Sequence, residues 1–290
     1  MNKERSWKLI NGLQRLFRAL PYSWSVGLGG ILGRILWAAS KKKVIEAESR
    51  CGKALRIETP RARQIVKASY ANLGRSVAEF VSMGKQRRRL PELIKIHGED
   101  HLKEALDRGR GVLMISAHIG NWEIGAARIA AKGYPMNAIG TEQRDDRITS
   151  LIIEKRAESG VTTVGKGFDL KAAIRCLKKG EILAILIDQD VRDRGVVVPF
   201  LDLPASTPYG PAKIATRLKS AMLPVFMVRR GVSAFHDLFI LPSPWERGYP
   251  EVDESMETAM TKCNDAISSF IRKYPEQWMW LYPRWASTVR

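Results

Sequence analysis

Residues 112–123, with the sequence VLMISAHIGNWE, predict a strand followed by a sharp turn and a helix. Val112 to Ala117 is an apolar run of strand length, and the glycine and asparagine that follow supply a break and a helix N-cap. His118 then lies at the carboxyl end of the strand, and Glu123 lies in the first helical turn. On an unbroken helix, side chains five residues apart point about 140° away from each other. The turn allows the imidazole and the carboxylate to converge.

This pair of side chains has two interpretations. In the first, His118 is a polar loop residue and Glu123 is an ordinary first-turn acid, whose ionised form the helix dipole favours by about 0.3 to 1 kcal/mol. In the second, His118 is a general base, and Glu123 orients it and stabilises its charged form. The position favours the second interpretation, because open α/β sheets bind their ligands at the carboxyl ends of the strands.

After residue 96 the chain alternates between short apolar runs and helical stretches. The expected strands are 112–117, 136–140, 161–164, 182–187 and 224–228, and the expected helices are 123–132, 148–158, 169–178 and 211–219. This alternation predicts βαβ units and therefore an α/β fold, in which helices cover a mostly parallel central sheet. The first 90 residues are expected to be mostly helical, with apolar residues at helical spacing over 60–85.

Polar side chains follow four of the expected strands. They are His118 after the first, residues 141–144 with Arg144 after the second, Lys166 after the third, and Asp188, Gln189 and Asp190 after the fourth. Because parallel strands deliver their carboxyl ends to one edge of a sheet, we expect these side chains to lie close together. Asp188 can serve there as a structural acid, a metal ligand or a substrate contact. Glu123, Asp188 and Asp190 are together compatible with magnesium, but no phosphate-binding loop accompanies them, so we predict no metal.

Nucleophile and disulfide chemistry have little support in the sequence. Ser116 and Ser206 do not lie in a G-x-S-x-G motif, which argues against a hydrolase of that type. The three cysteines, Cys51, Cys176 and Cys263, are far apart and lack CxxC spacing, so neither a disulfide framework nor a zinc site is indicated.

The net charge of the 290-residue chain is +18, and it is unevenly distributed. Residues 1–95 hold 21 Lys or Arg against 6 Asp or Glu, which accounts for +15 of that total. Such a surface attracts anions, and nucleic acid, an anionic membrane leaflet and an acidic protein or lipid are all compatible with it. A solvated basic helical face is the plainer alternative.

The amino-terminal segment favours a membrane surface. Residues 19–33 carry no charge but fall short of the roughly 20 apolar residues that a span needs. Basic residues on both sides and tryptophans near the edges predict an interfacial helix, with a buried core helix as the alternative. We therefore divide the chain into a membrane-associating segment, 1–43, and an α/β domain, 44–290.

Several motifs in order give the chain a family resemblance. SAHIGNWEIG (116–125), GEILAILIDQD (180–190), GVVVPFLDLPASTPYGPA (195–212), LPVFMVRR (223–230) and PEQWMWLYPRW (275–285) resemble the bacterial lipid A biosynthesis acyltransferases. The resemblance implies transfer of a fatty acyl chain from a thioester, with acyl carrier protein as donor, to a hydroxyl of a lipid A precursor. It also implies work without a cofactor, at the cytoplasmic face of the inner membrane.

The resemblance assigns roles to individual residues. His118 becomes the general base and Glu123 the acid of a catalytic dyad. The residues that it places in the polar, substrate-binding part of the site are Gly120, Asn121, Arg144, Asp188, Gln189 and Asp190. Backbone N–H groups near Gly120 and the helix start, or Arg144, are the expected donors to the oxyanion.

Two other functions remain as alternatives at this stage. One is an acyltransferase whose acceptor is another glycolipid or a lysophospholipid. The second is a basic nucleic-acid-binding protein. That second function lacks a recognisable reading motif, and the basic residues flank an apolar segment instead of an aromatic stacking platform, so no nucleic-acid partner is expected.

Overall fold

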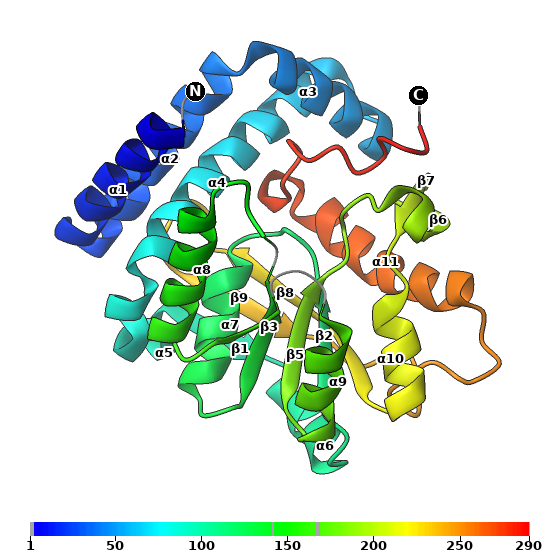
Figure 1. The fold of residues 1–290 in the computed structure, drawn as a ribbon. Coiled ribbons are helices and arrows are strands. Elements are labelled where there is room, and N and C mark those ends of the chain that lie inside the picture. The colour runs from blue at the N-terminus through cyan, green and yellow to red at the C-terminus, as the bar shows by residue number, and fades with distance from the viewer. Residues whose placement is uncertain (1–2, 141, 166–168, 290) are drawn as a thin grey trace.

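The structure is a computed structural model, which describes residues 3–140, 142–165 and 169–289 (Figure 1). The helices are α1 (Lys3–Ala19), α2 (Tyr22–Ala39), α3 (Lys41–Leu55), α4 (Thr59–Gln86), α5 (Leu90–Leu93), α6 (Glu99–Asp107), α7 (Trp122–Ala131), α8 (Asp146–Glu158), α9 (Leu170–Lys178), α10 (Gly210–Leu218) and α11 (Met256–Lys273), with short 3-10 turns η1 (Arg87–Arg89), η2 (Arg192–Arg194) and η3 (Pro275–Gln277). The strands are β1 (Ile94–His97), β2 (Val112–Ser116), β3 (Met136–Ile139), β4 (Thr162–Val164), β5 (Ile182–Leu186), β6 (Val196–Phe200), β7 (Leu203–Thr207), β8 (Ala221–Arg229) and β9 (His236–Ile240). Thr141 and Lys166, which we expected at the carboxyl edge of the sheet, lie outside the described residues.

A seven-stranded sheet in the described residues has the order β1-β9-β8-β2-β5-β3-β4. The five strands from β8 to β4 are parallel, which confirms the predicted α/β class with a mostly parallel sheet. Strands β9 and β1 run in the opposite direction, since β9 is antiparallel to β8 and parallel to β1. Strands β6 and β7 form a separate antiparallel hairpin.

Both faces of the sheet are covered, and strand β2 shows why. Its residues are all buried, and alternate ones point to opposite faces. Leu113 and Ile115 join an apolar cluster with residues of α9, α10 and α11, whereas Val112 and Met114 join a cluster with residues of α6 and α7. A strand buried on both sides reads as a continuous apolar run, which is the pattern that identified it in the sequence.

The expected strands and helices of the alternating part are present, with ends that differ by a few residues. The helices and strands that we did not predict are α5, α6, α11, β1, β9 and the β6–β7 hairpin. The three cysteines are buried and unpaired, and burial raises the pKa of each thiol to about 12.

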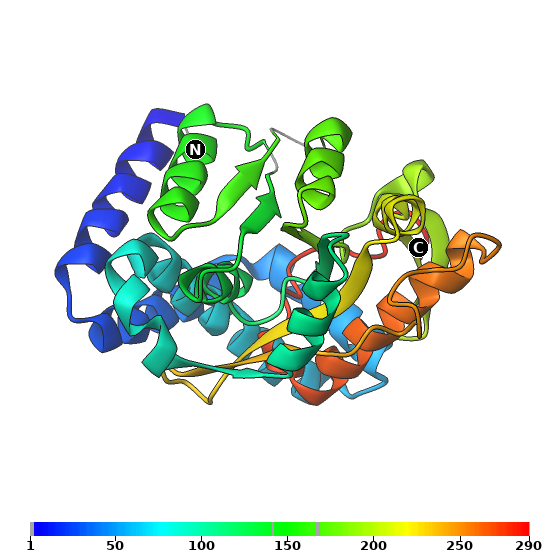
Figure 2. The ribbon, with the colours of Figure 1, turned by 90° about the horizontal axis from the view of Figure 1, so that it is seen from below.

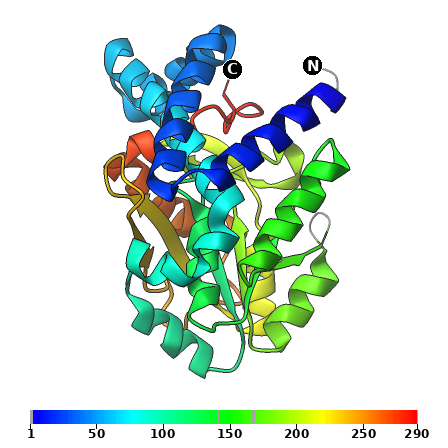
Figure 3. The same cartoon turned by 90° about the vertical axis from the view of Figure 1, so that its left-hand side faces the viewer.

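Helices α1 to α4 and the carboxyl-terminal residues lie over one end of the sheet (Figures 1 and 3). Figure 2, seen from below, shows α1 along the side of the molecule that carries α8. Two contacts join these helices there, because Arg147 pairs with Glu4 and lies over the ring of Trp7.

Helix α2 carries the apolar segment that we expected at a membrane. One side packs tightly on α4, where a Cβ on Gly29 or Gly33 would collide with the backbone of Gly74 or Tyr70. The other side is exposed and apolar, with Trp24, Ile31, Ile35 and Leu36 at its surface. None of the described helices is long and apolar enough to cross a membrane. The expected membrane contact of this segment therefore stays a prediction.

Candidate active site

The turn between β2 and α7 has the geometry that the sequence predicted. Asn121 is the N-cap of α7, and its side-chain oxygen accepts a hydrogen bond from the backbone N–H of Ile124. Gly120 has a φ of +61°, and a Cβ there would collide with the backbone oxygen of Met227. Only glycine meets both demands without strain. Glu123 lies in the first turn of α7, as expected.

His118 is hydrogen-bonded to Asp188, which lies two residues after the end of β5. Strands β2 and β5 are paired so that Ser116 lies opposite Leu186, and two residues further on the side chains meet. Nδ1 of His118 is 2.8 Å from Oδ1 of Asp188, and the backbone N–H of His118 donates to Oδ2 at 2.8 Å. If Nδ1 carries the proton that Asp188 accepts, Nε2 has a free lone pair and can act as a base.

Asp188 is buried and ionised. Burial by itself raises the pKa of the Asp188 carboxyl. The charge and hydrogen bonds of His118 and a hydrogen bond from Trp278 lower it by more, so the net pKa lies below the ordinary value. Nε1 of Trp278 donates to Oδ2 at 2.8 Å. Aromatic rings enclose the imidazole, since Trp122 meets it edge-on with ring centroids 4.7 Å apart and Tyr282 lies parallel to it at 6.4 Å.

Glu123 has a different partner from the one expected. Its Oε2 accepts from Nε of Arg156 at 2.9 Å and its Oε1 from Nη2 at 2.7 Å, which is a two-pronged ion pair. Burial lowers the pKa of the Arg156 guanidinium, but the hydrogen bonds and charge of Glu123 outweigh it, so that pKa is raised. The carboxylate in contact with His118 is thus that of Asp188. This corrects the expectation that Glu123 orients the imidazole directly, because both oxygens of Glu123 accept hydrogen bonds from Arg156.

The loop after β5 is fixed by the carboxyl-terminal segment. Arg284 is buried and donates to the backbone oxygens of Gln189 and Ser206 and to the hydroxyl of Thr207. Asp190 accepts hydrogen bonds from the backbone N–H and the hydroxyl of Ser287, both at 2.7 Å. These interactions account for the shape of the loop and hold Asp188 in place.

The remaining predicted residues lie in different environments. Gln189 lines the cavity beside His118, whereas Arg144 is exposed in the loop before α8. Asn121 is buried, and its amide nitrogen donates to Ser76 and Glu79. The N–H of Gly120, an expected oxyanion donor, instead donates to the backbone oxygen of Gln277 at 2.9 Å. That hydrogen bond corrects the expectation for Gly120.

Two cavities meet at the Glu123–Arg156 pair. The first is partly polar, and His118, Trp122, Gln143 and Gln189 are among its lining residues. The second lies under α7 and is mainly apolar; its walls include residues of β2, β3, β5, β8 and β9, namely Met114, Met136, Ala138, Ala184, Val225, Met227 and Leu238. Both cavities are lined by Trp122, Glu123, Ile139, Arg156, Ile185 and Leu186. A partly polar cavity beside His118 therefore adjoins a mainly apolar one.

The arrangement around His118 is suited to base chemistry. A histidine with a buried carboxylate behind one ring nitrogen and a cavity before the ring can remove a proton from a bound hydroxyl. The acids that we weighed as magnesium ligands are held by other groups: Asp188 by His118 and Trp278, Asp190 by Ser287, and Glu123 by Arg156.

Sequence reasoning missed Arg156 and Trp278. Arg156 lies near the end of α8, and it is more buried than Ile152, one turn earlier. Only its contact with Glu123 in the folded protein identifies it as a site residue. Trp278 belongs to a stretch with three tryptophans, Trp278, Trp280 and Trp285, whose density was a usable signal of a buried aromatic cluster.

Comparison with known proteins gives consistent matches over most of the chain. Residues 2–287 match a model of the family described as bacterial lipid A biosynthesis acyltransferase. The lipid A biosynthesis palmitoleoyltransferase and lauroyltransferase of Escherichia coli (strain K12) are 27% and 26% identical, each over 94% of this chain and over 88% and 89% of the relatives. A phosphatidylinositol mannoside acyltransferase of Mycolicibacterium smegmatis is 28% identical over 77% of this chain and 71% of its own length.

Proposed function

Since the chain belongs to the bacterial lipid A biosynthesis acyltransferase family and is an acyltransferase, we propose that it moves a fatty acyl chain from a thioester to a hydroxyl of a lipid A precursor. The observation that carries this proposal is the His118–Asp188 pair beside a polar cavity that adjoins an apolar one. The polar cavity suits a sugar hydroxyl, and the apolar cavity under α7 suits the hydrocarbon chain.

The proposed step needs one base and no covalent enzyme intermediate. Nε2 of His118 accepts the hydroxyl proton as the acceptor oxygen attacks the thioester carbonyl. The new C–O bond forms, and the tetrahedral intermediate then breaks its C–S bond. The leaving thiolate accepts from the imidazolium the proton that came from the acceptor hydroxyl. Asp188 stabilises the imidazolium, and base assistance of this kind contributes about 10² to 10⁴ in rate.

The oxyanion of that intermediate needs hydrogen-bond donors. The start of α7 remains available for this role, because the first N–H groups of a helix have no partner within it. The N–H of Ile124 is capped by Asn121, so the N–H groups of Trp122 and Glu123 are the ones that we assign. The buried Arg156 guanidinium adds positive charge beside them.

We propose acyl carrier protein as the donor and no cofactor. The net charge of +18 supports an acidic carrier, since a basic surface raises the rate of encounter with an acidic protein. The same field attracts an anionic lipid acceptor.

We further propose that the protein works on the cytoplasmic face of the inner membrane, with α2 as its contact. Trp24 is 70% exposed, and Ile31, Ile35 and Leu36 extend the apolar surface along the same helix. Lys41, Lys42 and Lys43 follow it directly and add attraction to anionic head groups, about 1 kcal/mol for each well-placed charge.

A different glycolipid is the second candidate acceptor. The phosphatidylinositol mannoside acyltransferase of Mycolicibacterium smegmatis matches this chain at an identity similar to that of the lipid A enzymes. An acyl-accepting mannoside and an acyl-accepting disaccharide both present hydroxyls to a base, so the His118 site serves either one.

Acyl transfer to defined acceptors distinguishes these functions. The purified protein is incubated with acyl carrier protein loaded with a labelled acyl chain and with a lipid A precursor, a phosphatidylinositol mannoside or a lysophospholipid. We expect label in the lipid A precursor, and none in the parallel reaction with His118→Ala. Transfer to the mannoside or the lysophospholipid alone would contradict the proposed acceptor, and loading the label on coenzyme A tests the donor.

Vesicle binding tests the membrane proposal. Removing residues 1–43 would uncover the α4 surface on which α2 packs, so substitutions on the exposed side are the better test. We expect the combined variant of Trp24→Ser, Ile31→Ser and Ile35→Ser to sediment with anionic vesicles at least tenfold less than the parent protein. Val232→Ser with Val252→Ser, at exposed apolar sites elsewhere, is the matched control. Equal binding by both variants would mean that another surface makes the contact.

A further inference from the structure

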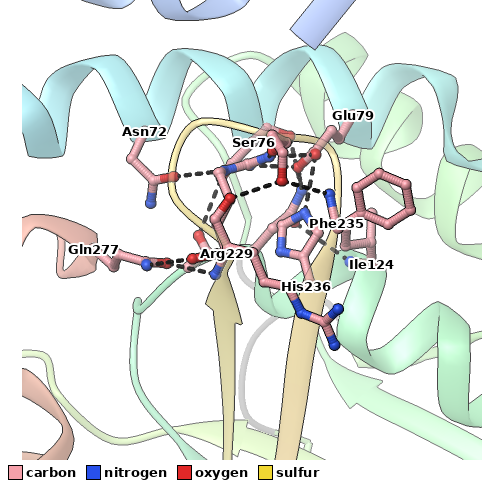
Figure 4. A network of polar contacts seen from close by, with 12 residues as sticks. Asn72, Ser76, Glu79, Ile124, Arg229, Phe235, His236 and Gln277 are labelled. Carbon is pink, nitrogen blue, oxygen red and sulfur yellow. Dashed lines mark hydrogen bonds and ion pairs between the residues drawn. The ribbon is translucent and has the colours of Figure 1, made fainter. Parts of the chain in front are cut away.

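We infer that the buried Glu79–Arg229 ion pair positions the turn between β2 and α7, residues 118–123. Glu79 and Arg229 act on the reaction through Asn121 and Gln277, without touching substrate. The inference rests on the proposed role of His118 as the base. Figure 4 shows the arrangement: Glu79 comes down from α4 and meets Arg229 and His236 at the ends of β8 and β9.

The ion pair is fully buried and uses both oxygens of the carboxylate. Nη1 of Arg229 is 2.6 Å from Oε1 of Glu79, and Nη2 is 2.6 Å from Oε2. Nε of Arg229 donates to Asn72 at 2.8 Å, and Nη1 also donates to the backbone oxygen of Ser233. The side chains of Glu79 and Arg229 are 0% exposed, so neither reaches the cavity before His118.

One connection runs from Glu79 to the start of α7. Oε2 of Glu79 accepts a hydrogen bond from the Asn121 amide at 2.8 Å, and the other end of that amide caps Ile124. The preceding turn of α4 adds a second contact, because the hydroxyl of Ser76 donates to the backbone oxygen of Gly120 at 3.0 Å. Residues 120 and 121, between His118 and Glu123, are therefore tied to α4.

A second connection runs from Arg229 to the other side of the imidazole. The Gln277 side chain accepts from the backbone N–H of Arg229 at 2.7 Å and donates to its backbone oxygen at 2.9 Å. The backbone oxygen of Gln277 accepts from Gly120, and the following residue, Trp278, donates to Asp188. Both groups that hold His118, the turn and the carboxylate, are thus joined to the ion pair.

His236 completes the network without adding a charge. It lies opposite Arg229 in the register of β8 and β9, and its Nε2 is 3.0 Å from Oε1 of Glu79. Burial lowers the pKa of His236 more than the adjacent carboxylate raises it. A lowered pKa favours the uncharged ring at neutral pH, in which Nε2–H donates to Glu79.

The choice of an ion pair at this place supports a positioning role. A buried ion pair contributes little to stability compared with apolar side chains of similar volume, but it fixes directions that apolar contacts leave free. Here the fixed directions are those of the Asn121 amide and the Gln277 side chain. A purely structural cluster has no need to end on Asn121, in the turn after the base, and on Gln277, which precedes the tryptophan that binds Asp188.

Two variants separate positioning from folding. Asn121→Ser keeps a good helix cap but is too short to reach Glu79, so it cuts the first connection and leaves the ion pair intact. Glu79→Leu with Arg229→Met replaces the pair by apolar side chains, a change that often preserves stability. Glu254→Gln is the matched control: this acid is held by Lys262 and Trp245, in the segment between β9 and α11.

The measurements are kcat and KM for acyl transfer, the melting temperature, and hydrogen exchange of a peptide that spans 116–125. We expect Asn121→Ser and the double variant to melt within a few degrees of the parent, to lose about tenfold to a hundredfold in kcat with KM within twofold, and to exchange faster over 116–125. The control is expected to change none of these.

The outcomes test the inference apart from the proposed function. An unchanged kcat, or unchanged exchange over 116–125, in a folded Asn121→Ser variant would overturn the positioning role. If the double variant does not fold, Asn121→Ser alone decides. If the parent protein transfers no acyl chain, the proposed function fails, and exchange over 116–125 still tests the mechanical connection.

Discussion

The two sides of the 118–123 turn differ in what surrounds them. In front, His118 and Glu123 line a cavity, and the imidazole remains partly accessible. Behind, Glu79 and Arg229 have no exposed side-chain surface. Both sides hold charged groups in pairs, but only the front can meet a ligand. In our proposal the front carries the chemistry, and the rear fixes the position of the groups that perform it.

The difference predicts that substitutions separate into two classes. A change in front should reduce turnover with little loss of stability, because the cavity is already open to solvent. Glu123 is the exception, since its removal leaves the charge of Arg156 unpaired. A change behind should lower stability, turnover or both, because the oxygens of Glu79 and the guanidinium nitrogens of Arg229 have partners that would be left unpaired in a buried place. A front variant that unfolds, or a rear variant that alters only substrate affinity, would break the comparison.

The largest effect is expected for His118→Ala. Removing the base should lower kcat by about 10² to 10⁴, while Asp188 keeps hydrogen bonds from the backbone N–H of residue 118 and from Trp278. The melting temperature should therefore change by only a few degrees. Turnover and thermal unfolding of the purified variant check this, and near-normal turnover in a folded sample would refute the base.

Asp188→Asn should come close to that loss. Oδ2 accepts two N–H groups, so the oxygen of the new amide is retained there and its NH₂ faces Nδ1 of His118. Nδ1 must then accept, the proton moves to Nε2, and the base is blocked. We expect kcat to fall by at least 10² with KM little changed. A variant as active as the parent would show that Asp188 does not set the tautomer.

Glu123→Ala should be nearly as damaging as His118→Ala, although through Arg156. The guanidinium would be left without its partner at the junction of the two cavities, at a cost of up to about 3 kcal/mol in the free energy of unfolding. Adding Arg156→Met should restore stability but not turnover. Urea unfolding and kcat of the single and double variants measure the two effects, and recovered turnover in the double variant would show that Glu123 only neutralises Arg156.

On the rear side, acid should reveal Glu79. Burial raises the pKa of the Glu79 carboxyl, but His236 and Arg229 lower it by a larger amount, so the pKa falls from 4.5 to about 2. Because the folded pKa is depressed, the stabilisation is complete above about pH 4.5 and is lost as the pH falls toward 2, in total about 3 kcal/mol. His236, whose folded pKa is also lowered, destabilises the fold in the same direction below about pH 6.5.

Urea unfolding from pH 7 to pH 3 measures this acid effect. The parent protein and Glu254→Gln should lose stability in parallel as the pH falls. Glu79→Gln should start lower and decline less, since it lacks the titrating carboxyl. Parallel curves for Glu79→Gln and the parent would assign the acid sensitivity to other groups.

The front of the turn was more predictable from sequence than the rear. The strand, the glycine break and the Asn121 cap are local signals, and they placed His118 correctly at the end of β2. The partner of His118 is 70 residues away, and only the register of β2 against β5 brings Asp188 opposite it. Sequence spacing favoured the nearer acid, Glu123, which is why its pairing was misassigned.

The rear network left almost no sequence signal. Glu79 stands in an amphipathic helix among basic residues, where an acid normally faces solvent. Arg229 and His236 come together because β9 runs antiparallel to β8, and β9 was not among the predicted strands. The ambiguity of α2 has a similar origin, since the same glycine-rich apolar pattern suits packing on α4 and contact with lipid.

The smallest effects are expected from truncating one amide on each side. Gln189→Ala removes a side chain that lines the front cavity, while the backbone oxygen that Arg284 binds remains, so kcat/KM should fall less than tenfold at an unchanged melting temperature. Asn72→Ala leaves Nε of Arg229 without its acceptor in a buried place, which costs about 1 to 3 kcal/mol. Thermal unfolding and steady-state kinetics on both variants compare the two sides directly. If Gln189→Ala melts at a lower temperature than Asn72→Ala, the buried network around Glu79 and Arg229 does not contribute more to stability than the cavity side of the turn.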